Sequence, residues 1–533
     1  MVSAGHPLAA QAGLRMLERG GNAIDAMIAT QLVLTLVEPQ SSGLGGGAFL
    51  LYYDAHAKRI HAFDGRETAP SGATRDLFLA RGEPMPFRQA VVGGRSVGVP
   101  GTPRLLEAAH ARHGKLPWAT LFEPAIELAE KGFPISERLS RIAGVYKELA
   151  DQPAARAHFF TAAGKPKPPG TVLRNPQLAA TLRALAAKGA DAFYTGDIAR
   201  DIVDAVRGHA NPGTMSLEDL AGYRVRVVEP LCGNYRDKRL CGMPPPSSGG
   251  IAILQILGML SRFDLASVRP ISAEAAHLLA EAERLAYADR NRYVGDDRFV
   301  DVPTHALVDP GYLAERSKLI ARSASMGIAR AGTPPGVKSE FADSPDKEVS
   351  ATAQICVVDG DGNAVSMTTT IESIFGSFIM VRGFMLNNEL TDFNFSPLEE
   401  GRITANAVAP GKRPRSSMAP FIVRDATTGA LDMVVGSPGG SLIIEYVAQA
   451  LVAAIDWKMD MQSAVALPHM GSRNGPTELE KGTELERIAD VLRAMGHDVR
   501  LIDMPSGLQG IRRVAGGLEG GADPRREGAA VGR

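Results

Sequence analysis

Residues 352–370, TAQICVVDGDGNAVSMTTT, contain two β-rich runs separated by the turn sequence Asp-Gly-Asp-Gly-Asn. Apolar and β-branched residues dominate both runs, and Gly beside Asp or Asn is typical of a tight connection between strands. The segment is therefore predicted to form a β-hairpin whose first strand begins at Thr352. The preceding residues 326–347 combine Gly, Pro, Ser and charges without periodicity, which predicts a surface linker.

Helices are predicted on both sides of this hairpin. Residues 6–19 are amphipathic and end at a Gly pair, and residues 23–37 are mostly apolar before Glu38-Pro39. Further helices are predicted at 101–113, 116–131, 273–293, 441–457 and 478–496. Helices alternate with short strands and no internal repeat is found, so a mixed α+β fold is expected.

Composition excludes several classes of protein. The 533 residues, 45% hydrophobic and 22% charged, can bury a large core. Lys plus Arg (58) nearly equals Asp plus Glu (59), so no overall field favours nucleic acid or a membrane surface. The longest apolar run, 26–37, is too short to span a bilayer. No signal peptide is evident, which predicts a cytoplasmic location, or a periplasmic or secreted one if an upstream start is missing.

The metal-ligating residue types form no convincing site. Cys232, Cys241 and Cys356 lack a ligand-like spacing and are interpreted as small buried thiols. His110 and His113 could share one helical face, but no second ligand pair accompanies them. No metal and no cofactor are predicted.

A glycine cluster at 43–48, GLGGGA, fits the GxGxxA dinucleotide-binding pattern, and Glu67 lies at the distance of a ribose-binding acid. That motif requires a strand before the glycines and a helix after them. Here a predicted helix precedes the cluster and the strand-like AFLLYY follows. A dinucleotide site is therefore not predicted.

Three short segments in the second half suggest one site: TTTIE (368–372), PRSSM (414–418) and GSPGG (436–440). Alternation along a strand would place Thr370 and Glu372 on one face, directed into the same pocket. Gly439 and Gly440 follow an apolar run and precede a helix, where backbone N–H groups can hold an oxyanion. An ordinary strand-to-helix turn is the alternative interpretation of these glycines.

These segments belong to a series of matches along nearly the whole chain. The sequence resembles the gamma-glutamyltranspeptidase family of N-terminal nucleophile hydrolases through segments that include GGNAIDAMIAT (20–30), SSGLGGGAFLLYY (41–53), FDGRETAP (63–70), AEAERLAYADRNRYVGD (280–296), GKRPRSSMAP (411–420) and GADPRREGAAVG (521–532). The resemblance implies a four-layer αββα sandwich. It also implies a proenzyme cleaved into a large subunit, 1–351, and a small catalytic subunit, 352–533, which together form one domain.

The resemblance places the nucleophile at Thr352 and the scissile bond between Ala351 and Thr352. In such a precursor the Thr hydroxyl attacks the preceding carbonyl, the acyl group shifts from nitrogen to oxygen, and water releases the ester. The freed α-amine, with a reference pKa near 8, then serves as the base. This chain has Ala353 and Gln354 where relatives usually have Thr and His. Ser350 remains a second candidate nucleophile, although it does not match the family spacing.

The resemblance also assigns the surrounding residues. Thr370 corresponds to a second Thr that hydrogen-bonds the nucleophile, and Gly439 and Gly440 supply the oxyanion N–H groups. A γ-glutamyl substrate carries an α-carboxylate and an α-ammonium, which require opposite charges. The carboxylate would be held by Arg66, Ser416 and Ser417, and the ammonium by Glu372, Glu389 and Asp392.

The implied function is a self-processing γ-glutamyltransferase and glutathione hydrolase. It would cleave γ-glutamyl amides through an ester on the Thr, with water or an acceptor amino acid or peptide completing the reaction. One alternative is an amidase for another acyl group, such as a cephalosporin side chain or poly-γ-glutamate. Another is an unprocessed, catalytically silent protein that binds γ-glutamyl ligands.

Overall fold

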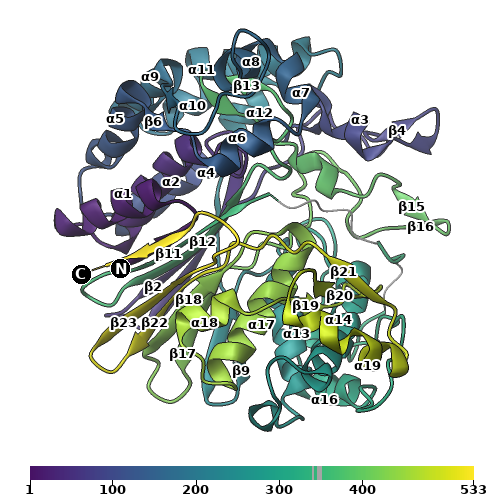
Figure 1. Cartoon of the computed structure of the whole chain (residues 1–533). Coiled ribbons are helices and arrows are strands. Elements are labelled where there is room, and N and C mark those ends of the chain that lie inside the picture. The colour runs from purple at the N-terminus through teal and green to yellow at the C-terminus, as the bar shows by residue number, and fades with distance from the viewer. Residues whose placement is uncertain (339–340, 345–350, 533) are drawn as a thin grey trace.

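The computed structural model describes residues 1–338, 341–344 and 351–532. Ser350 and parts of the predicted linker, 339–340 and 345–347, lie outside them. Two antiparallel sheets stack at the centre of the molecule (Figure 1). The first has the order β24 (Ala529–Val531), β1 (Val2–Ala4), β11 (Ala353–Val358), β12 (Ala364–Thr370), β2 (Gly47–Asp54), β3 (Arg59–Gly65) and β8 (Arg226–Val228). The second has the order β23 (Gly517–Ala522), β22 (Gln509–Val514), β18 (Leu431–Gly436), β17 (Phe421–Asp425), β10 (Lys238–Gly242) and β9 (Leu231–Tyr235).

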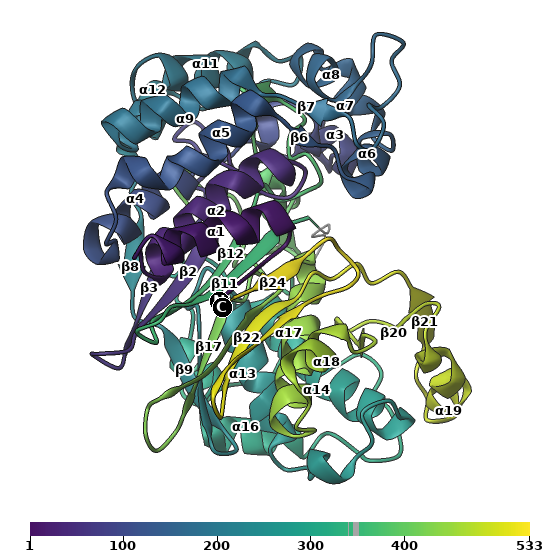
Figure 2. The ribbon, with the colours of Figure 1, turned by 60° about the vertical axis from the view of Figure 1, so that its left-hand side comes forward.

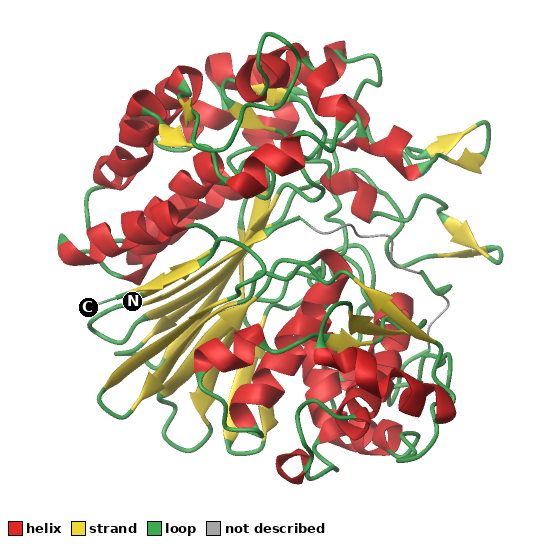
Figure 3. Ribbon diagram, in the orientation of Figure 1, coloured by secondary structure: helices red, strands yellow, loops and turns green. Residues whose placement is uncertain are grey.

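Helices cover the outer face of each sheet, so the predicted αββα sandwich is confirmed (Figures 2 and 3). Those over the first sheet include α1 (Pro7–Glu18), α2 (Ala23–Val37), α4 (Thr102–His113), α5 (Glu123–Lys131) and α9 (Pro176–Lys188). Those over the second include α13 (Gly249–Leu260), α14 (Ala273–Tyr293), α16 (Pro310–Ser317), α17 (Ile443–Ile455) and α18 (Met461–Ala466). Among the described helices, none combines the length and apolarity needed to cross a membrane.

Strand β2 shows why the centre of the sandwich is apolar on both faces. Phe49, Leu51 and Tyr53 belong to the core between the sheets and under α13 and α17. Leu50 and Tyr52 alternate with them and pack against the helices over the first sheet. A strand covered on both faces has a continuous apolar sequence, which explains the run AFLLYY.

The predicted hairpin is confirmed as β11 and β12, which pair from Ala353↔Thr369 to Val358↔Ala364. Its turn is closed by Asp359, whose carboxylate accepts the N–H groups of Asp361 and Asn363 at 3.0 and 2.9 Å. On the outer sides β11 pairs with β1 and β12 pairs with β2. The hairpin therefore lies inside the first sheet, which places Thr352 deep in the molecule.

Two of the predicted helices differ from the structure. The segment 478–496 begins as β20 (Thr477–Glu480), continues as a short 3-10 helix (Glu484–Ile488), and is α-helical only in α19 (Ala489–Ala494). Its first part is extended because β20 pairs in parallel with β21 (Val499–Ile502). The segment 116–131 contains a 3-10 helix (Trp118–Phe122) before α5, which begins with Glu123-Pro124.

The interpretation of all three cysteines as buried thiols is wrong for two of them. Cys232 on β9 and Cys241 on β10 are directly paired across the hairpin, with Cα atoms 4.1 Å apart, and form a disulfide. Only Cys356 is free, and it is buried. The nine-residue separation reveals this pairing only once the intervening segment is known to be a hairpin.

Candidate active site

Thr352 lies immediately before β11 and is held at each of its polar groups. Its hydroxyl oxygen is 3.0 Å from the hydroxyl oxygen of Thr370. Its backbone N–H donates to the carbonyl of Ser41 at 3.1 Å, and its own carbonyl accepts from Arg526 at 2.9 Å. The residue is 4% exposed. These contacts fix the direction of the hydroxyl relative to its own peptide.

The backbone of Thr352 is in an unusual conformation, with φ at 85°. For a β-branched residue a positive φ is a genuine outlier, because the side chain crowds the backbone. Such conformations cost about 1–3 kcal/mol and persist only where the surroundings impose them. Strain is therefore located at the residue that forms the predicted scissile bond.

Thr370 ends β12 and joins two parts of the site. Its hydroxyl also accepts the N–H of Glu372 at 2.9 Å. The expectation that Thr370 and Glu372 share one strand face is wrong in detail, because the strand ends at Thr370 and Glu372 adopts a φ of 74°. Both residues nevertheless border the same cavity.

The glycine cluster supports this end of β12. A Cβ on Gly46 would lie 1.9 Å from the carbonyl oxygen of Thr370. Only glycine permits so close an approach of the two backbones. A helix precedes the cluster and strand β2 follows it, so the rejection of a dinucleotide site agrees with the fold.

Arg66 lies in the floor of the site among carboxylates. Its guanidinium forms ion pairs with Glu389 and Asp392 and donates to the carbonyls of Pro414 and Arg415 at 3.2 and 2.9 Å. Burial alone would lower the pKa of Arg66, but Glu389 and Asp392 raise it above its ordinary value. Arg66 is therefore a permanent cation within the acidic group.

The acidic side of the site is crowded. Burial and then the nearby charge of Glu372 raise the pKa of Asp392 well above its ordinary value, and Arg66 opposes this shift. The carboxylate of Glu372 accepts hydrogen bonds from Ser373 and Asn388. Three carboxyl groups facing one cation leave the pocket suited to a positively charged ligand group.

Ser416 and Ser417 line the same cavity and follow Pro414, whose carbonyl accepts from Arg66. The Ser417 hydroxyl accepts from Arg290 at 2.7 Å, and the Ser416 hydroxyl accepts the N–H of Met418 at 3.1 Å. The carbonyl of Ser416 accepts from the hydroxyl of Ser248 at 2.8 Å. Residues 416–418 are thus held by groups from the predicted large subunit.

Gly439 and Gly440 lie between β18 and α17, at the start of a 3-10 helix (Gly440–Leu442). Gly439 has a φ of 148°, and a Cβ there would lie 2.7 Å from the ring of Tyr446. Gly440 borders the same cavity as Thr352. The placement next to a helix start is the one expected for N–H groups that stabilise an oxyanion.

One small cavity brings together nine of the predicted site residues. It is lined by Arg66, Thr352, Thr370, Glu372, Glu389, Asp392, Ser416, Ser417 and Gly440, with Met418 and Ile443, while Gly439 is adjacent in sequence. Its volume is about 20 Å³. That is room for about one water, far below the several hundred Å³ of ordinary ligand pockets. The cavity in this structure is therefore smaller than a γ-glutamyl group.

Among the described residues, one group has the spacing of metal ligands: His277, Glu281 and His497. His277 Nε2 donates to the Ala321 carbonyl at 2.6 Å, and its Nδ1 is 2.8 Å from His497 Nε2. Glu281 accepts from the Ser325 hydroxyl and the Met326 N–H, both at 2.7 Å. These atoms complete a hydrogen-bond network, so the cluster is better explained as structural than as a metal site.

Sequence reasoning did not single out Arg526, Arg290 and Asn388. Arg526 and Arg290 lie in two of the segments that carried the family resemblance, GADPRREGAAVG and AEAERLAYADRNRYVGD. Their contacts with Thr352 and Ser417 join segments 174 and 127 residues apart. No local pattern reveals such pairs.

A Thr at the head of a central strand in an αββα sandwich, with a second hydroxyl beside it, defines the class of N-terminal nucleophile hydrolases. Residues 9–533 match the gamma-glutamyltranspeptidase family, and the chain belongs to that family. The chain is 39% identical to the glutathione hydrolase proenzyme of Bacillus subtilis (strain 168), covering 100% of this chain and 91% of that one. It is 37% identical to the acylase ACY 1 proenzyme of Pseudomonas sp. (strain SE83), covering 100% and 93%. The solved structure of a cephalosporin acylase from Bacillus halodurans superposes with a TM-score of 0.85 at 29% identity, covering 99% and 94%.

Proposed function

We propose that this protein is a self-processing γ-glutamyltransferase and glutathione hydrolase that acts through Thr352. The observation that carries the proposal is the cavity in which the Thr352 hydroxyl, 3.0 Å from that of Thr370, faces three carboxylates and one Arg. A hydroxyl nucleophile supplies the acyl-transfer chemistry, and the charges select the substrate. Full-length relatives that are glutathione hydrolase proenzymes support the same assignment.

Self-cleavage is the first reaction proposed. The Thr352 hydroxyl attacks the carbonyl carbon of Ala351, and the acyl group moves from nitrogen to oxygen. Water then hydrolyses the ester, which leaves Ala351 as a C-terminal carboxylate and Thr352 with a free α-amine. Breaking the bond removes the peptide that defines φ at Thr352, so the strain at 85° is released with the product.

The second reaction uses the freed amine. With a reference pKa near 8, it is partly neutral at physiological pH and takes the proton of its own hydroxyl. The hydroxyl attacks the γ-carbonyl of the substrate, and the N–H groups of Gly439 and Gly440 stabilise the oxyanion. Collapse releases an amine such as cysteinylglycine. Water, or an acceptor amino acid or peptide, resolves the γ-glutamyl ester.

Charge favours a γ-glutamyl group over a simple dicarboxylic acyl group. The α-ammonium is assigned to Glu372, Glu389 and Asp392, and the α-carboxylate to Arg66 with the hydroxyls of Ser416 and Ser417. An acyl group with a carboxylate but no ammonium would bring a further negative charge toward three buried carboxyl groups. Like charges repel each other strongly in a buried site.

The decisive experiment separates processing from substrate choice. Purified protein is incubated, resolved by denaturing electrophoresis, and the smaller product is sequenced from its N-terminus. Two bands with Thr352 first are expected, and glutathione should release glutamate and cysteinylglycine. A single full-length band after prolonged incubation would instead favour the silent binding protein.

An acylase for another acyl group is the second candidate, and the likeness to the Bacillus halodurans acylase structure is the observation that favours it. Mass-identified products from glutathione and from a glutaryl amide distinguish the two. Hydrolysis of the glutaryl amide alone would overturn the γ-glutamyl assignment.

A further inference from the structure

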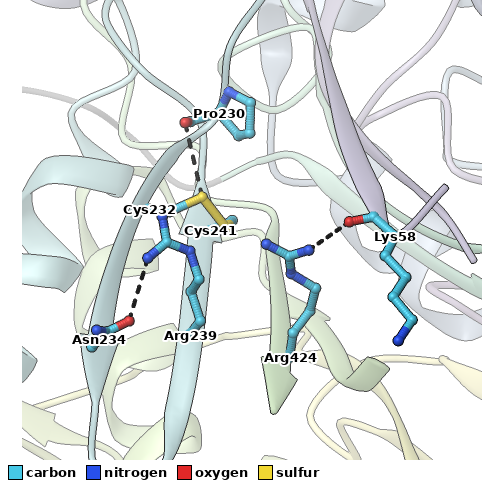
Figure 4. The surroundings of a disulfide bond; sticks show 7 residues. All are labelled: Lys58, Pro230, Cys232, Asn234, Arg239, Cys241 and Arg424. Carbon is cyan, nitrogen blue, oxygen red and sulfur yellow. Dashed lines mark hydrogen bonds between the residues drawn. A yellow bond between two sulfur atoms is a disulfide. The ribbon is translucent and has the colours of Figure 1, made fainter. Parts of the chain in front are cut away.

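The outer edge of the second sheet carries a feature unrelated to Thr352. Strands β9 and β10 hold the Cys232–Cys241 disulfide, and the side chains of Arg239 and Arg424 lie beside it (Figure 4). Two cavities meet there. One of about 770 Å³ extends toward α13 and α16, and one of about 480 Å³ lies between β3 and the β9–β10 hairpin. Cys232 and Arg239 line both.

The smaller cavity is cationic. Lys58, Arg59, Arg239 and Arg424 line it, and the acid among its lining residues, Glu229, is paired with Arg59 at 2.8 Å. Within the described part of the chain, no carboxylate lies within 4 Å of a charged nitrogen of Arg239 or Arg424. Two guanidinium groups on paired positions of β10 and β17 therefore repel each other without compensation.

Arg424 also lacks a partner for its charge and for one of its buried hydrogen-bond donors within the described part of the chain. It donates to the backbone carbonyl of Lys58 at 2.7 Å, but its buried Nε has no acceptor among the described residues. Burial and the neighbouring Arg239 lower the pKa of Arg424, although Tyr53 opposes this. Arg239 is exposed, and among the described residues its guanidinium has a single hydrogen-bond partner, Asn234, at a long 3.5 Å. An anion in the cavity would satisfy both groups.

The two cysteines of the disulfide differ in exposure. Cys241 is fully buried, whereas Cys232 is partly exposed and borders both cavities. Thiol–disulfide exchange requires a thiolate to reach one sulfur along the bond. Of the two cysteines, Cys232 is the one that borders these cavities, from which a thiolate could approach it. The free Cys356 is fully buried, and burial raises the pKa of its thiol to about 12, so it does not compete.

We propose that this cavity is a second site, which binds a small anionic thiol and exchanges disulfides with it at Cys232. The identity of that thiol as glutathione rests on the proposed function; the site itself does not. The glutathione sulfur, as thiolate, bonds to Cys232 Sγ while the Cys232–Cys241 bond breaks. The electron pair and the proton lost by the incoming thiol go to Cys241, which becomes a buried thiol. No further oxidant or reductant is needed.

The cations determine which thiols react fastest. Glutathione carries two carboxylates and one ammonium, so it is anionic at neutral pH, while 2-mercaptoethanol is neutral and cysteamine is cationic. A cleft lined by one sign of charge raises association rates of the opposite charge by tenfold or more. Rates corrected for thiolate fraction should therefore fall in the order glutathione, 2-mercaptoethanol, cysteamine.

The test uses the Thr352→Ala protein, which cannot consume glutathione at the proposed active site. Each thiol is added to the oxidised protein, the reaction is quenched with acid, and intact mass and peptide mapping locate the adduct. One glutathione on Cys232 with a new thiol at Cys241 is expected. Arg239→Gln should reduce the glutathione rate about tenfold relative to 2-mercaptoethanol. Arg487→Gln, another exposed Arg, should change neither rate.

Three results would overturn the proposal: no adduct in the folded protein, an adduct on Cys241, or an unchanged charge preference in Arg239→Gln. The 2-mercaptoethanol rate in each variant serves as the internal reference for folding and access. Failure here would leave self-cleavage and γ-glutamyl hydrolysis by the wild-type protein untouched. Conversely, a wild-type protein without hydrolase activity would still allow the exchange to be measured.

Discussion

Gln354 lies two residues after the proposed nucleophile, at a position where the family resemblance predicts His. Its amide donates to the Ser366 hydroxyl at 3.0 Å and its carbonyl oxygen accepts from the Thr368 hydroxyl at 2.6 Å. It also packs against Gly436, where a Cβ would lie 2.4 Å from the Gln354 amide carbon. The side chain therefore joins β11 and β12 to the strand that leads to Gly439. The departure from the family pattern leaves no polar group of Gln354 unsatisfied, so it gives no structural reason to expect failed processing.

Removal of the Thr370 hydroxyl should slow the reactions of Thr352 while the protein still folds. Thr370→Val keeps the shape but deletes both the contact with Thr352 and the acceptor of the Glu372 N–H. Self-cleavage and kcat should each fall about 100-fold, as when a positioned hydrogen-bonding group of the site is lost. Thr369→Val is the matched control, because Thr369 faces the other way and its hydroxyl has no partner among the described residues. Band densitometry over time and initial rates with glutathione measure both. Equal effects of the two substitutions would argue against a specific role for Thr370.

The residues of the site were predictable to different degrees. Motif positions such as Thr370, Arg66 and Ser416 could be assigned from family resemblance because each lies in a recognisable segment. The ion pairs between Arg66 and its acidic neighbours could not, since they join positions 323 and 326 residues apart. The unusual φ of Thr352 has no sequence signal at all, because Thr normally avoids it.

Among the elements, α14 and α17 contain a buried carboxyl pair. Glu283 on α14 and Glu445 on α17 meet at Gly471, where a Cβ would lie 2.5 Å from one carboxylate and 2.8 Å from the other. Glu283 accepts the N–H of Ser472 at 2.8 Å, and Glu445 has no donor in the described part of the chain. Burial raises the pKa of both groups, and their mutual repulsion raises that of Glu445 further.

This pair should make the fold less stable as pH rises. The folded state binds protons more tightly than the unfolded state, so the stabilisation is complete below the ordinary Glu pKa of 4.5 and is lost between that value and the raised one. Glu445→Gln mimics the protonated form. In the uncleaved Thr352→Ala background, it should raise Tm by about 1 °C at pH 8.5, which corresponds to roughly 1 kcal/mol for a cooperative unit of this size, and have little effect at pH 5.

The control for this prediction is Glu484→Gln, which removes an exposed carboxylate. Thermal unfolding followed by circular dichroism from pH 5 to 8.5 gives the comparison. If Glu445→Gln and Glu484→Gln share the pH dependence of the parent, the pair does not titrate in the way its burial implies.

The close contact between the glycine cluster, 43–48, and the end of β12 can be tested by substituting Gly46. Gly46→Ala would drive a methyl group into the Thr370 carbonyl, 1.9 Å away, and overpacking of this kind costs about 1–3 kcal/mol. Thr370 must then shift away from Thr352, so slow self-cleavage and a lower Tm are expected. At Gly43 the nearest atom is the Thr35 methyl carbon at 3.3 Å, so Gly43→Ala is the milder control. Normal processing of Gly46→Ala would show that the close approach does not position Thr370.

At the scale of the elements, strand periodicity and turn residues were sufficient to predict β11 and β12. They were insufficient for 478–496, where apolar spacing suggested one long helix. The structure makes the first part a strand because β21 is available to pair with it, and that partner lies in the sequence after the segment. The local sequence pattern does not show which strands pair with each other. The Cys232–Cys241 disulfide was not predicted for the same reason.

Across the whole molecule, each sheet is built from both sides of the Ala351–Thr352 bond. In the first sheet, β1 from the predicted large subunit lies between β24 and β11 of the predicted small subunit. In the second, β10 and β9 of the predicted large subunit extend the edge formed by β17. Residues 352–533 alone would thus lack β1 inside the first sheet and the edge strands β10 and β9 of the second.

Cleavage should therefore leave one cooperative unit rather than two separable domains. After complete processing, the subunits should co-elute in size-exclusion chromatography and part only in the denaturant range where the sheets unfold, because separation requires breaking the β1 ladders on both sides. Urea titration followed by circular dichroism and by elution volume should give the same midpoint for both signals. The uncleaved Thr352→Ala protein provides the reference transition for the intact sandwich. Release of residues 352–533 at a urea concentration that preserves the circular dichroism signal would contradict the interleaved assembly. The released part would lack β1, the strand that joins β24 to β11, so the first sheet could not stay intact.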